Sequence, residues 1–492
     1  MRTRRFLLPA AASTLLLSAV VLTGCTVADT ATSTTVEIEE TNSETVLTAA
    51  VAAAEEILAA NENATTVNPD EWDPEAGTTI TLQGDSAAVD GSGATADGDT
   101  VTITTAGTYL VTGALDGQLV VAAPDDAVVA IILDDATISS TTSAAITVAS
   151  ADDVVISLLG DNYLSDTDSY ASDADVNAAL FSEADLTITG EGSLTVAGNG
   201  NDGITSEDDL VILSGNLTID AVEDGVRGKD ALVIEGGTLS VAAGGDALTS
   251  DNEDEELRGY IQLAGGTLEL VAGDDGVDAT TDIVVTGGEI TIDAAGDGLN
   301  AETILFVAEG VIDVVDSYEG LESAALTIAG GTVDVVSSDD GLNGSVSDSA
   351  GAREGDGSAI LISGGVVTVF AGGDGIDSNG DAAVTGGTVI ATSPFTGPEA
   401  AMDTSGDFSG SSFVWTNVAA QVGDIVQVVA DDGTVVVEYT TVQETASIFV
   451  ASPHIEAGVS YTVTVAGSVA VTVVGDEILE FDDSRGGGGQ RP

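Results

Sequence analysis

Acidic residues recur at two positions of a repeated turn, and oxygen-bearing side chains in such a pattern are typical of cation sites. The first position holds aspartate or glutamate, and in five copies the position three residues later holds a carboxylate or an amide. These five pairs are the candidate metal ligands: Asp275 and Asp278, Asp297 and Asn300, Glu319 and Glu322, Asp340 and Asn343, and Asp374 and Asp377. Ca²⁺ accepts six to eight oxygen ligands in flexible geometry, so we expect Ca²⁺ here.

If the repeats stack, each of the two positions becomes a column of like charges. Neighbouring carboxylates one layer apart then repel by about 3–4 kcal/mol at an effective dielectric of 20, so the columns need a counter-ion. Turn chemistry is the alternative explanation for the first column, because Asp-Gly pairs favour turns. It gives no role to Asp278, Glu322 or Asp377, which favours the cation interpretation.

Two further groups near the columns are candidate binding residues. An insertion contains Asp251, Asn252, Glu253 and Asp254, which either complete a cation site or form a solvated loop. The basic cluster Arg227-Gly228-Lys229 offers Arg227 and Lys229 for ligand binding. The alternative for this cluster is a local ion pair with one of three neighbours: Glu223, Asp224 or Asp230.

Residues for catalysis are scarce. The chain has one histidine, His454, and one cysteine, so the sequence predicts no Ser-His-Asp triad. Pairs of carboxylates suited to glycoside hydrolysis occur in any acidic ladder and therefore indicate nothing. We predict no catalytic residues from the sequence.

The acidic turns belong to a repeat of about 22 residues that runs from Gly192 to Thr388. Glycines of the acidic turn and of a second turn keep the same intervals, and alternating apolar residues between them predict short strands. In this pattern Ile292 and Leu299 face inward. Glycine every few residues excludes a helical solenoid. The repeat predicts an all-β fold, a parallel β-helix over residues 76–398.

The ends of the chain differ from the repeats. Residues 1–24 predict a lipoprotein signal peptide, because a basic start and an apolar run precede Leu22-Thr23-Gly24-Cys25. This motif resembles a lipobox, in which Cys25 would be the lipidated residue. An ordinary secretory signal is the alternative. Residues 25–75 predict a flexible tether that contains a possible Ala-rich helix over 44–60. Residues 399–475 predict a small antiparallel β domain that caps the repeats, and 476–492 a disordered tail.

The charge of the chain limits its partners. There are 83 acidic and 9 basic residues, for a formal net charge of −74. Binding to nucleic acid or to anionic lipid headgroups needs basic residues, so neither partner is expected. We expect the protein to contact the membrane only through the lipid on Cys25. This anchor would hold it on the extracellular face of the bacterial cytoplasmic membrane. Solubility at high salt is the alternative role of the acidity.

Three runs carry a resemblance to a known family: Glu223–Asp230 continued by Gly236-Gly237-Thr238, then Gly245–Asp254, and Gly373–Gly380 continued by Gly386–Ile390. They are similar to the bacterial carbohydrate-binding-domain family of surface β-helix proteins, and the likeness covers roughly residues 78–465. The resemblance implies a right-handed parallel β-helix like that of pectate lyases, bound calcium, and binding of cell-wall polysaccharides such as pectic acid or cellulose without established catalysis. The sequence departs from the family's repeat at Ala247 and Thr249.

These observations lead to one hypothesis with two alternatives. We expect a lipid-anchored polysaccharide-binding protein, in which Ca²⁺ bridges protein and sugar carboxylates and removes the repulsion between two acidic polymers. The alternatives are a Ca²⁺-dependent polysaccharide lyase of the same fold and a structural or adhesive stalk.

Overall fold

The computed structural model describes residues 40–172, 174–346, 357–397, 400–410 and 412–477. The chain divides into two units, Met1–Thr41 and Asn42–Pro492, and all the described strands belong to the second. The predicted signal peptide and Cys25 lie outside the described residues. Within the ranges given above, no helix combines the length and the apolar character needed to cross a membrane.

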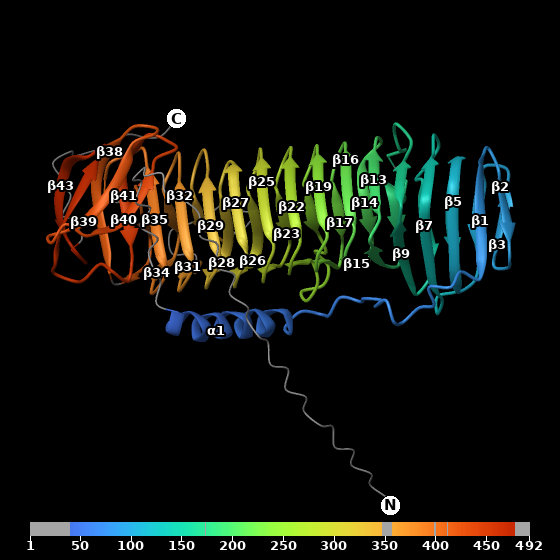
Figure 1. Ribbon diagram of the computed structural model, residues 1–492, viewed down its shortest axis with the longest axis horizontal. Helices are drawn as coiled ribbons and strands as arrows, with labels where there is room; N and C mark the ends of the chain where they lie inside the picture. The colour runs from blue at the N-terminus through green and yellow to red at the C-terminus, as the bar shows by residue number, and fades with distance from the viewer. Residues whose placement is uncertain (1–39, 173, 347–356, 398–399, 411, 478–492) are drawn as a thin grey trace, which may run out of the picture. The chain divides into compact units, whose positions relative to one another are not determined.

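The fold is all-β, and most strands pair in parallel with a strand of the next repeat (Figure 1). The pairs form three series, one for each strand position in the repeat. The strands of the first series pair in this order: β10 (Asp161–Ser165), β13 (Ser193–Gly198), β16 (Asn216–Ala221), β19 (Thr238–Ala243), β22 (Thr267–Ala272), β25 (Glu289–Ala294), β27 (Val311–Asp316), β29 (Thr332–Val336), β32 (Val366–Phe370) and β35 (Thr388–Ser393).

The other two series share β26 and β28, which are long enough to pair in both. The second series contains β8 (Ile146–Ser150), β11 (Ala178–Ser182), β14 (Asp202–Ser206), β17 (Val226–Gly228), β20 (Leu248–Ser250), β23 (Val277–Ala279), β26 (Leu299–Val307), β28 (Leu321–Ile328), β30 (Leu342–Gly344), β33 (Ile376–Ser378) and β36 (Asp403–Thr404). The third series adds β9 (Asp153–Leu159), β12 (Asp185–Gly190), β15 (Asp209–Ile212), β18 (Ala231–Ile234), β21 (Tyr260–Leu263), β24 (Asp282–Val285), β31 (Ala359–Ile362), β34 (Asp381–Val384) and β37 (Phe408–Gly410).

The first strands of the described chain are less regular. Strands β1 and β2 pair antiparallel, as do β3 and β4, while β5, β6 and β7 join the parallel pairing. Their bounds are β1 (Thr78–Gly84), β2 (Ala87–Asp90), β3 (Ala94–Asp97), β4 (Thr100–Ile103), β5 (Gly107–Asp116), β6 (Gln118–Ala122) and β7 (Val128–Ser139). The antiparallel pairs occupy the end of the stack, where an open strand edge would otherwise be exposed.

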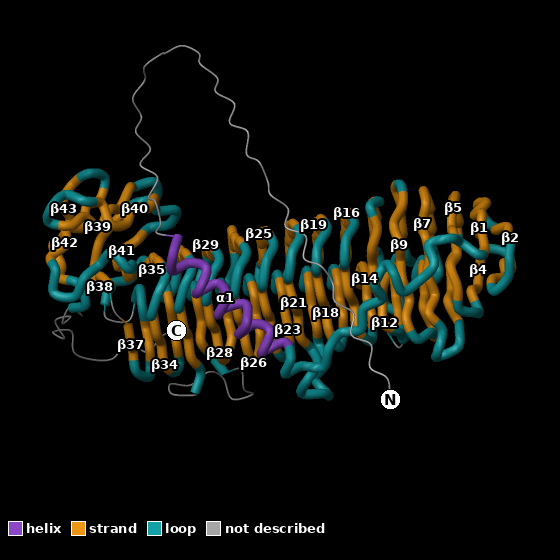
Figure 2. The backbone as a smooth tube through the Cα atoms, turned by 60° about the horizontal axis from the view of Figure 1, so that its bottom comes forward, coloured by secondary structure: helices purple, strands orange, loops and turns teal. Residues whose placement is uncertain are grey.

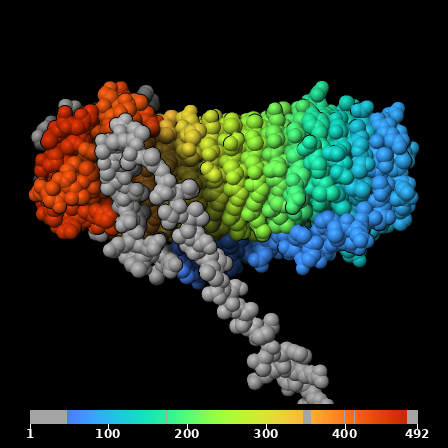
Figure 3. All heavy atoms as spheres, viewed as in Figure 1, coloured from blue at the N-terminus to red at the C-terminus, as the bar shows by residue number. Residues whose placement is uncertain are grey.

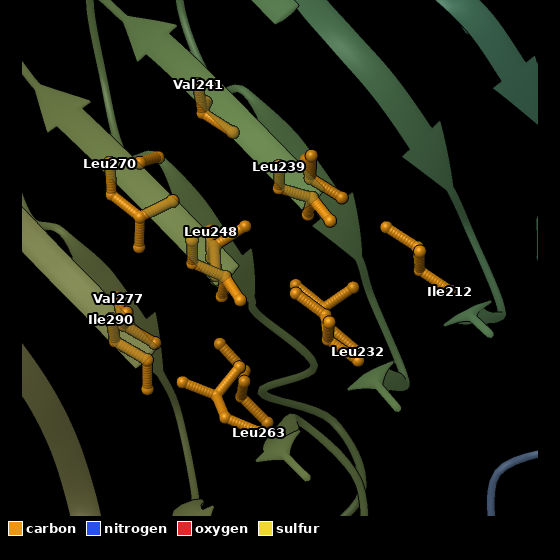
Figure 4. Packing of buried hydrophobic residues seen from close by; sticks show 14 of the residues in the cluster. Ile212, Leu232, Leu239, Val241, Leu248, Leu263, Leu270, Val277 and Ile290 are labelled. Atoms are coloured by element: carbon orange, nitrogen blue, oxygen red, sulfur yellow. The ribbon is translucent and has the colours of Figure 1, made fainter. Parts of the chain in front are cut away.

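Alternate residues of the three series point inward and form one hydrophobic core. Leu239 and Leu270 of the first series, Leu248 of the second and Leu263 of the third converge in Figure 4. Ile292 and Leu299 are fully buried, as the alternation predicted. Each such side chain contributes about 1.5–3 kcal/mol through burial. In the space-filling view, the repeats form successive bands across one face (Figure 3).

The two glycine series of the repeat serve different purposes. In the second turn the backbone adopts positive φ, for example 95° at Gly288, where a side chain is strained. In the acidic turn the cause is close approach: a Cβ on Gly276 would lie 2.6 Å from the carbonyl oxygen of Gly298 in the next repeat. The Asp-Gly pairs of the acidic turn thus reflect packing between repeats as well as turn chemistry.

The predicted flexible tether is wrong for the described part of residues 25–75. Helix α1 (Glu40–Leu58) covers residues 44–58 of the predicted Ala-rich helix and buries Ala50 and Ala54 against Val284, Phe306 and Ala308 (Figure 2). The tether interpretation failed because it gave this segment nothing to pack on, whereas the outward face of the third series offers apolar side chains.

The chain after α1 is also held against the third series. The side chain of Asn61 donates to Asp282, and the backbone N–H of Thr65 donates to Asp209 at 2.7 Å. Farther on, the backbone N–H of Val67 donates to the hydroxyl of Thr187. Residues 59–67 therefore pass from strand to strand of the third series and are hydrogen-bonded to them, unlike a free linker.

The antiparallel strands predicted after the repeats are present. Strand β41 (Thr445–Ala451) pairs antiparallel with both β35 and β38 (Phe413–Ala420). A separate four-stranded antiparallel sheet has the order β40 (Val435–Thr440), β39 (Ile425–Ala430), β42 (Ser460–Val465) and β43 (Ser468–Val474). Apart from Asp476 and Glu477, the predicted tail lies outside the described residues.

Candidate metal and ligand sites

The second acidic column exists as predicted. Asp278 on β23 pairs in register with Asn300 on β26, and Asn300 pairs with Glu322 on β28. The column continues from Glu322 to Asn343 on β30 and from Asn343 to Asp377 on β33. Parallel strands lie about 4.8 Å apart, so these side chains stack one above another on short strands of the second series.

The first column lies in the turns that precede these strands and forms a chain of hydrogen bonds. Oδ1 of Asp275 accepts from the backbone N–H of Asp297 at 2.6 Å, and Oδ1 of Asp297 accepts from the backbone N–H of Glu319 at 3.0 Å. The same bond joins Asp202 to Asp224, Asp224 to Asp246, Asp246 to Asp275, and Asp340 to Asp374. The turn carboxylates thus connect successive repeats, a role that neither sequence interpretation included.

Three of the predicted ligands converge at one place. Asp297, Glu319 and Glu322 each offer one carboxylate oxygen, and these oxygens lie within 4.8 Å of one another. Asn343 lies beside them, since its Nδ2 donates to Oε2 of Glu319 at 2.6 Å. Its side chain is 8% exposed, and its buried Oδ1 has no hydrogen-bond partner among the described residues. We call these four residues the Glu319 cluster.

Burial makes the negative charge of these columns unfavourable. It raises the pKa of Glu319 to about 9, with the neighbouring Glu322 as the second cause, and the pKa of Asp297 to about 7. Burial also raises the pKa of Asp278 to about 8 and that of Asp377 to about 7. Side chains that resist ionisation in this way are stabilised as carboxylates by a nearby cation.

The remaining predicted ligands lie along the two columns, outside the Glu319 cluster: Asp275, Asp278, Asn300, Asp340, Asp374 and Asp377. Nδ2 of Asn300 donates to Oδ1 of Asp278 at 3.0 Å, so this amide stabilises the Asp278 carboxylate without an ion. The columns are therefore continuous, but along their described residues three carboxylates come together only at the Glu319 cluster.

The structure does not gather the four candidates of the insertion. Asp251 pairs with Arg227, and the buried side chain of Asn252 bonds to Asp230 and to two backbone N–H groups of its own loop. Glu253 and Asp254 are exposed. The loop uses its polar groups for its own conformation and for contacts with the preceding repeat.

The basic cluster forms ion pairs, but not with the three expected neighbours. Nη1 of Arg227 lies 2.8 Å from Oε1 of Glu207, and its Nε lies 2.9 Å from Oδ1 of Asp251. Lys229 Nζ lies 3.1 Å from Oε2 of the same Glu207. Arg227 itself occupies the second column, in register between Thr205 and Thr249.

A polar pocket of about 500 Å³ opens beside Arg227. Its lining comes from the loop before β11, from successive acidic turns and from the insertion: Ala174, Asp175, Asn177, Asn201, Asp202, Glu207, Glu223, Asp224, Arg227 and Asp251. We call it the Arg227 pocket. Burial raises the pKa of Asp202, one of the lining residues, to about 7.

Comparison with known proteins identifies the family. A sequence profile of carbohydrate-binding domain-containing proteins matches residues 97–356, which include both the Glu319 cluster and the Arg227 pocket. The chain belongs to this family. A carbohydrate-binding domain-containing protein of Acetivibrio thermocellus is 39% identical over 128 residues, which are 25% of this chain and 45% of that protein. The match thus spans less than half of the relative's length.

A solved structure is also similar to this carbohydrate-binding domain-containing protein. It is that of the polysaccharide lyase-like protein from C. thermocellum, as a gadolinium derivative. The sequence identity is 32%, the TM-score is 0.46, and the alignment covers 47% of this chain and 96% of the solved one.

Sequence reasoning missed a second acidic group of this carbohydrate-binding domain-containing protein. Asp185, Asp208 and Asp209, in the third series, bring carboxylate oxygens within 4.8 Å of one another. Asp209 accepts from the backbone N–H of Thr65, Asp185 accepts from the backbone N–H of Asp209, and Asp208 lies 3.7 Å from Arg258, so protein groups engage all three. The group could not be found from the repeat, because the chain after α1 supplies part of its environment.

Proposed function

We propose that this chain is a non-catalytic, Ca²⁺-dependent polysaccharide-binding protein that is held at the extracellular face of the cytoplasmic membrane by lipid on Cys25. Membership of the carbohydrate-binding family supports the polysaccharide partner. The Glu319 cluster is the observation that carries the Ca²⁺ dependence, because it joins three carboxylates to an unpartnered buried amide oxygen. The proposed glycans are cell-wall polymers such as pectic acid or cellulose.

The donor set of the Glu319 cluster fits Ca²⁺. Carboxylate and amide oxygens are the side-chain ligands that Ca²⁺ prefers, and its flexible coordination leaves positions for water or sugar oxygens. Asn343 Oδ1 is an acceptor that burial has left without a donor, and such an atom is costly unless a ligand satisfies it. Asp297, Glu319, Glu322 and Asn343 would hold the ion.

The cation would supply positive charge between two acidic polymers. The protein's own residues position that charge on a rigid stack of short strands and bury it enough to limit screening. A glycan carboxylate that approaches the ion-free Glu319 cluster meets the repulsion of its carboxylates. Binding of acidic glycans should therefore need Ca²⁺, whereas a protein that binds them through basic side chains would not.

The finer architecture belongs to the same proposal. We take the three parallel series as the faces of a right-handed parallel β-helix with one repeat in each turn. In such a solenoid the acidic turns lie along one edge, where a long polymer can contact several repeats. The solenoid thus gives the cation columns access to a glycan along their length.

The proposal is tested by sedimentation of the protein with insoluble polygalacturonate and with cellulose, with Ca²⁺ and with chelator. Glu322→Gln should lose the Ca²⁺-dependent binding, while Glu269→Gln, the same change on an exposed strand position outside the cluster, should retain it. Equal binding with and without Ca²⁺ would overturn the Ca²⁺ dependence. Release of unsaturated, ultraviolet-absorbing products from polygalacturonate would favour the lyase alternative.

A further inference from the structure

The Arg227 pocket is distinct from the Glu319 cluster in both position and chemistry. The pocket is lined in part by residues of β14 and β17 in the second series. The residues of the cluster lie on β28, on β30 and in the turns before β26 and β28. The pocket volume of about 500 Å³ lies within the range of small-ligand sites, about 300–1,000 Å³. It is large enough for a sugar residue.

The pocket offers both donors and acceptors of hydrogen bonds. A guanidinium has five N–H donors. Arg227 uses Nε and Nη1 for Asp251 and Glu207, and its Nη2 makes no hydrogen bond to a described residue. Asn177 donates through Nδ2 to Asp202 at 2.9 Å, while its buried Oδ1 has no partner among the same residues. A ligand that both donates and accepts can satisfy both groups.

The electrostatics of the pocket disfavour an anionic ligand. Six carboxylates line it against a single guanidinium, and two of the six already pair with that guanidinium. A uronate that approached Arg227 would meet the repulsion of the other four. The pocket therefore differs from a carboxylate-binding site, in which basic side chains outnumber acidic ones.

A bare metal ion does not suit the pocket either. Within the described ranges, carboxylate oxygens come within 4.8 Å of one another in groups of three at the Glu319 cluster and at Asp185, Asp208 and Asp209, but not in this pocket. The positive charge of Arg227 also opposes a second cation. An uncharged ligand rich in hydroxyl groups meets neither obstacle, because each hydroxyl donates to a carboxylate and accepts from a guanidinium.

We propose that the Arg227 pocket binds an uncharged sugar residue through its hydroxyl groups, with Arg227 as donor and the pocket carboxylates and Asn177 as acceptors. The inference rests on the proposed function, since it adds a site for neutral sugars to a polysaccharide-binding protein. A glycan in which neutral and acidic residues alternate or occur in blocks would then engage the pocket and the Glu319 cluster together.

The test is calorimetric titration of the full chain in saturating Ca²⁺ with cellohexaose, xylohexaose and hexagalacturonate. Arg227→Met should weaken binding of a neutral oligosaccharide at least tenfold and leave hexagalacturonate binding unchanged. Glu322→Gln should do the reverse. Lys229→Met is the matched control: it removes a cation from Glu207 but lies outside the pocket lining, so it should leave neutral-sugar affinity within twofold.

A second variant guards against misfolding of Arg227→Met. Glu223→Gln changes an exposed lining residue, should keep the wild-type melting temperature, and should also weaken neutral-sugar binding. Failure of both neutral sugars to bind, or binding that Arg227→Met and Glu223→Gln leave unaltered, would overturn the pocket proposal. If hexagalacturonate still binds with Ca²⁺ in those cases, the proposed function stands and only the pocket assignment fails.

Discussion

Two regions of one column differ in the side chains that lie beside buried negative charge. In the upstream region, on β14, β17 and β20, the column reads Thr205, Arg227 and Thr249, and the turn acids beside it face a guanidinium that the protein supplies. In the downstream region, on β23 to β33, the same positions hold only carboxylates and amides: Asp278, Asn300, Glu322, Asn343 and Asp377.

At the column positions, the strands of the second series pair in register in both regions. At these positions, the two regions therefore differ in their side chains. An internal arginine pairs with two of the upstream carboxylates, whereas the downstream column has no basic member, and under our proposal Ca²⁺ from the solution balances its charge. Under that proposal, one scaffold carries an ion-independent site and an ion-dependent site a few repeats apart.

The largest predicted effect tests whether the core beneath the two regions is equivalent. Ile219→Asp upstream and Ile292→Asp downstream each bury an unpaired carboxylate among apolar side chains and should cost more than about 4 kcal/mol. Denaturant unfolding monitored by circular dichroism measures this cost. An unchanged transition for either variant would mean that the region around it lacks the continuous core, and the comparison would fail.

Removal of the cation should separate the regions. Because a ligand that binds only the folded state stabilises it by about 2.7 kcal/mol at 100 times its Kd, chelation should lower the melting temperature. Hydrogen exchange should then increase at β26, β28 and β30 and remain unchanged at β14, β17 and β20. Identical melting curves with Ca²⁺ and with chelator would leave the downstream column without its proposed ion.

Charge removal from the turns should act in only one region. Asp297→Asn combined with Asp340→Asn should weaken Ca²⁺ binding about tenfold, about 1.4 kcal/mol, and should be neutral or stabilising in chelator because repulsion decreases. The matched upstream pair, Asp224→Asn with Asp246→Asn, should leave Ca²⁺ affinity unaltered. Calorimetric titration of chelated protein with Ca²⁺ measures both, and equal losses from the two pairs would erase the proposed distinction.

The smallest effect concerns an acid outside both regions. Burial, with Asp208 and Asp209 nearby, raises the pKa of Asp185 to about 7, so the folded state holds this proton more tightly than the unfolded state. Wild-type stability should therefore fall as the pH rises from about 4 to about 7, and Asp185→Asn should escape that loss. After allowance for its partial exposure, the variant should gain ~1 kcal/mol at pH 8 and nothing at pH 4 in urea unfolding.

Much of the fold followed from period and composition, because stacked repeats place equivalent residues together. For that reason, the sequence predicted the inward position of Ile292 and the alignment of Asp278 with Glu322. The contact of Ala50 and Ala54 with the third series was not, since a helix that docks on an outer face leaves no mark on the repeat. The partners of Arg227 were also missed, because Glu207 and Asp251 belong to the neighbouring repeats.

The hydrogen bonds of the first column have a consequence for how such a chain can change its length. From Asp202 to Glu319, and again from Asp340 to Asp374, the backbone N–H of an acidic turn donates to the carboxylate of the turn before it, as Asp297 donates to Asp275. A whole repeat thus brings one donor and one acceptor. Deletion or duplication of a whole repeat leaves each remaining N–H donor paired with a carboxylate acceptor, whereas loss of part of a repeat does not. Gene duplication and excision can therefore alter the number of sites in complete units.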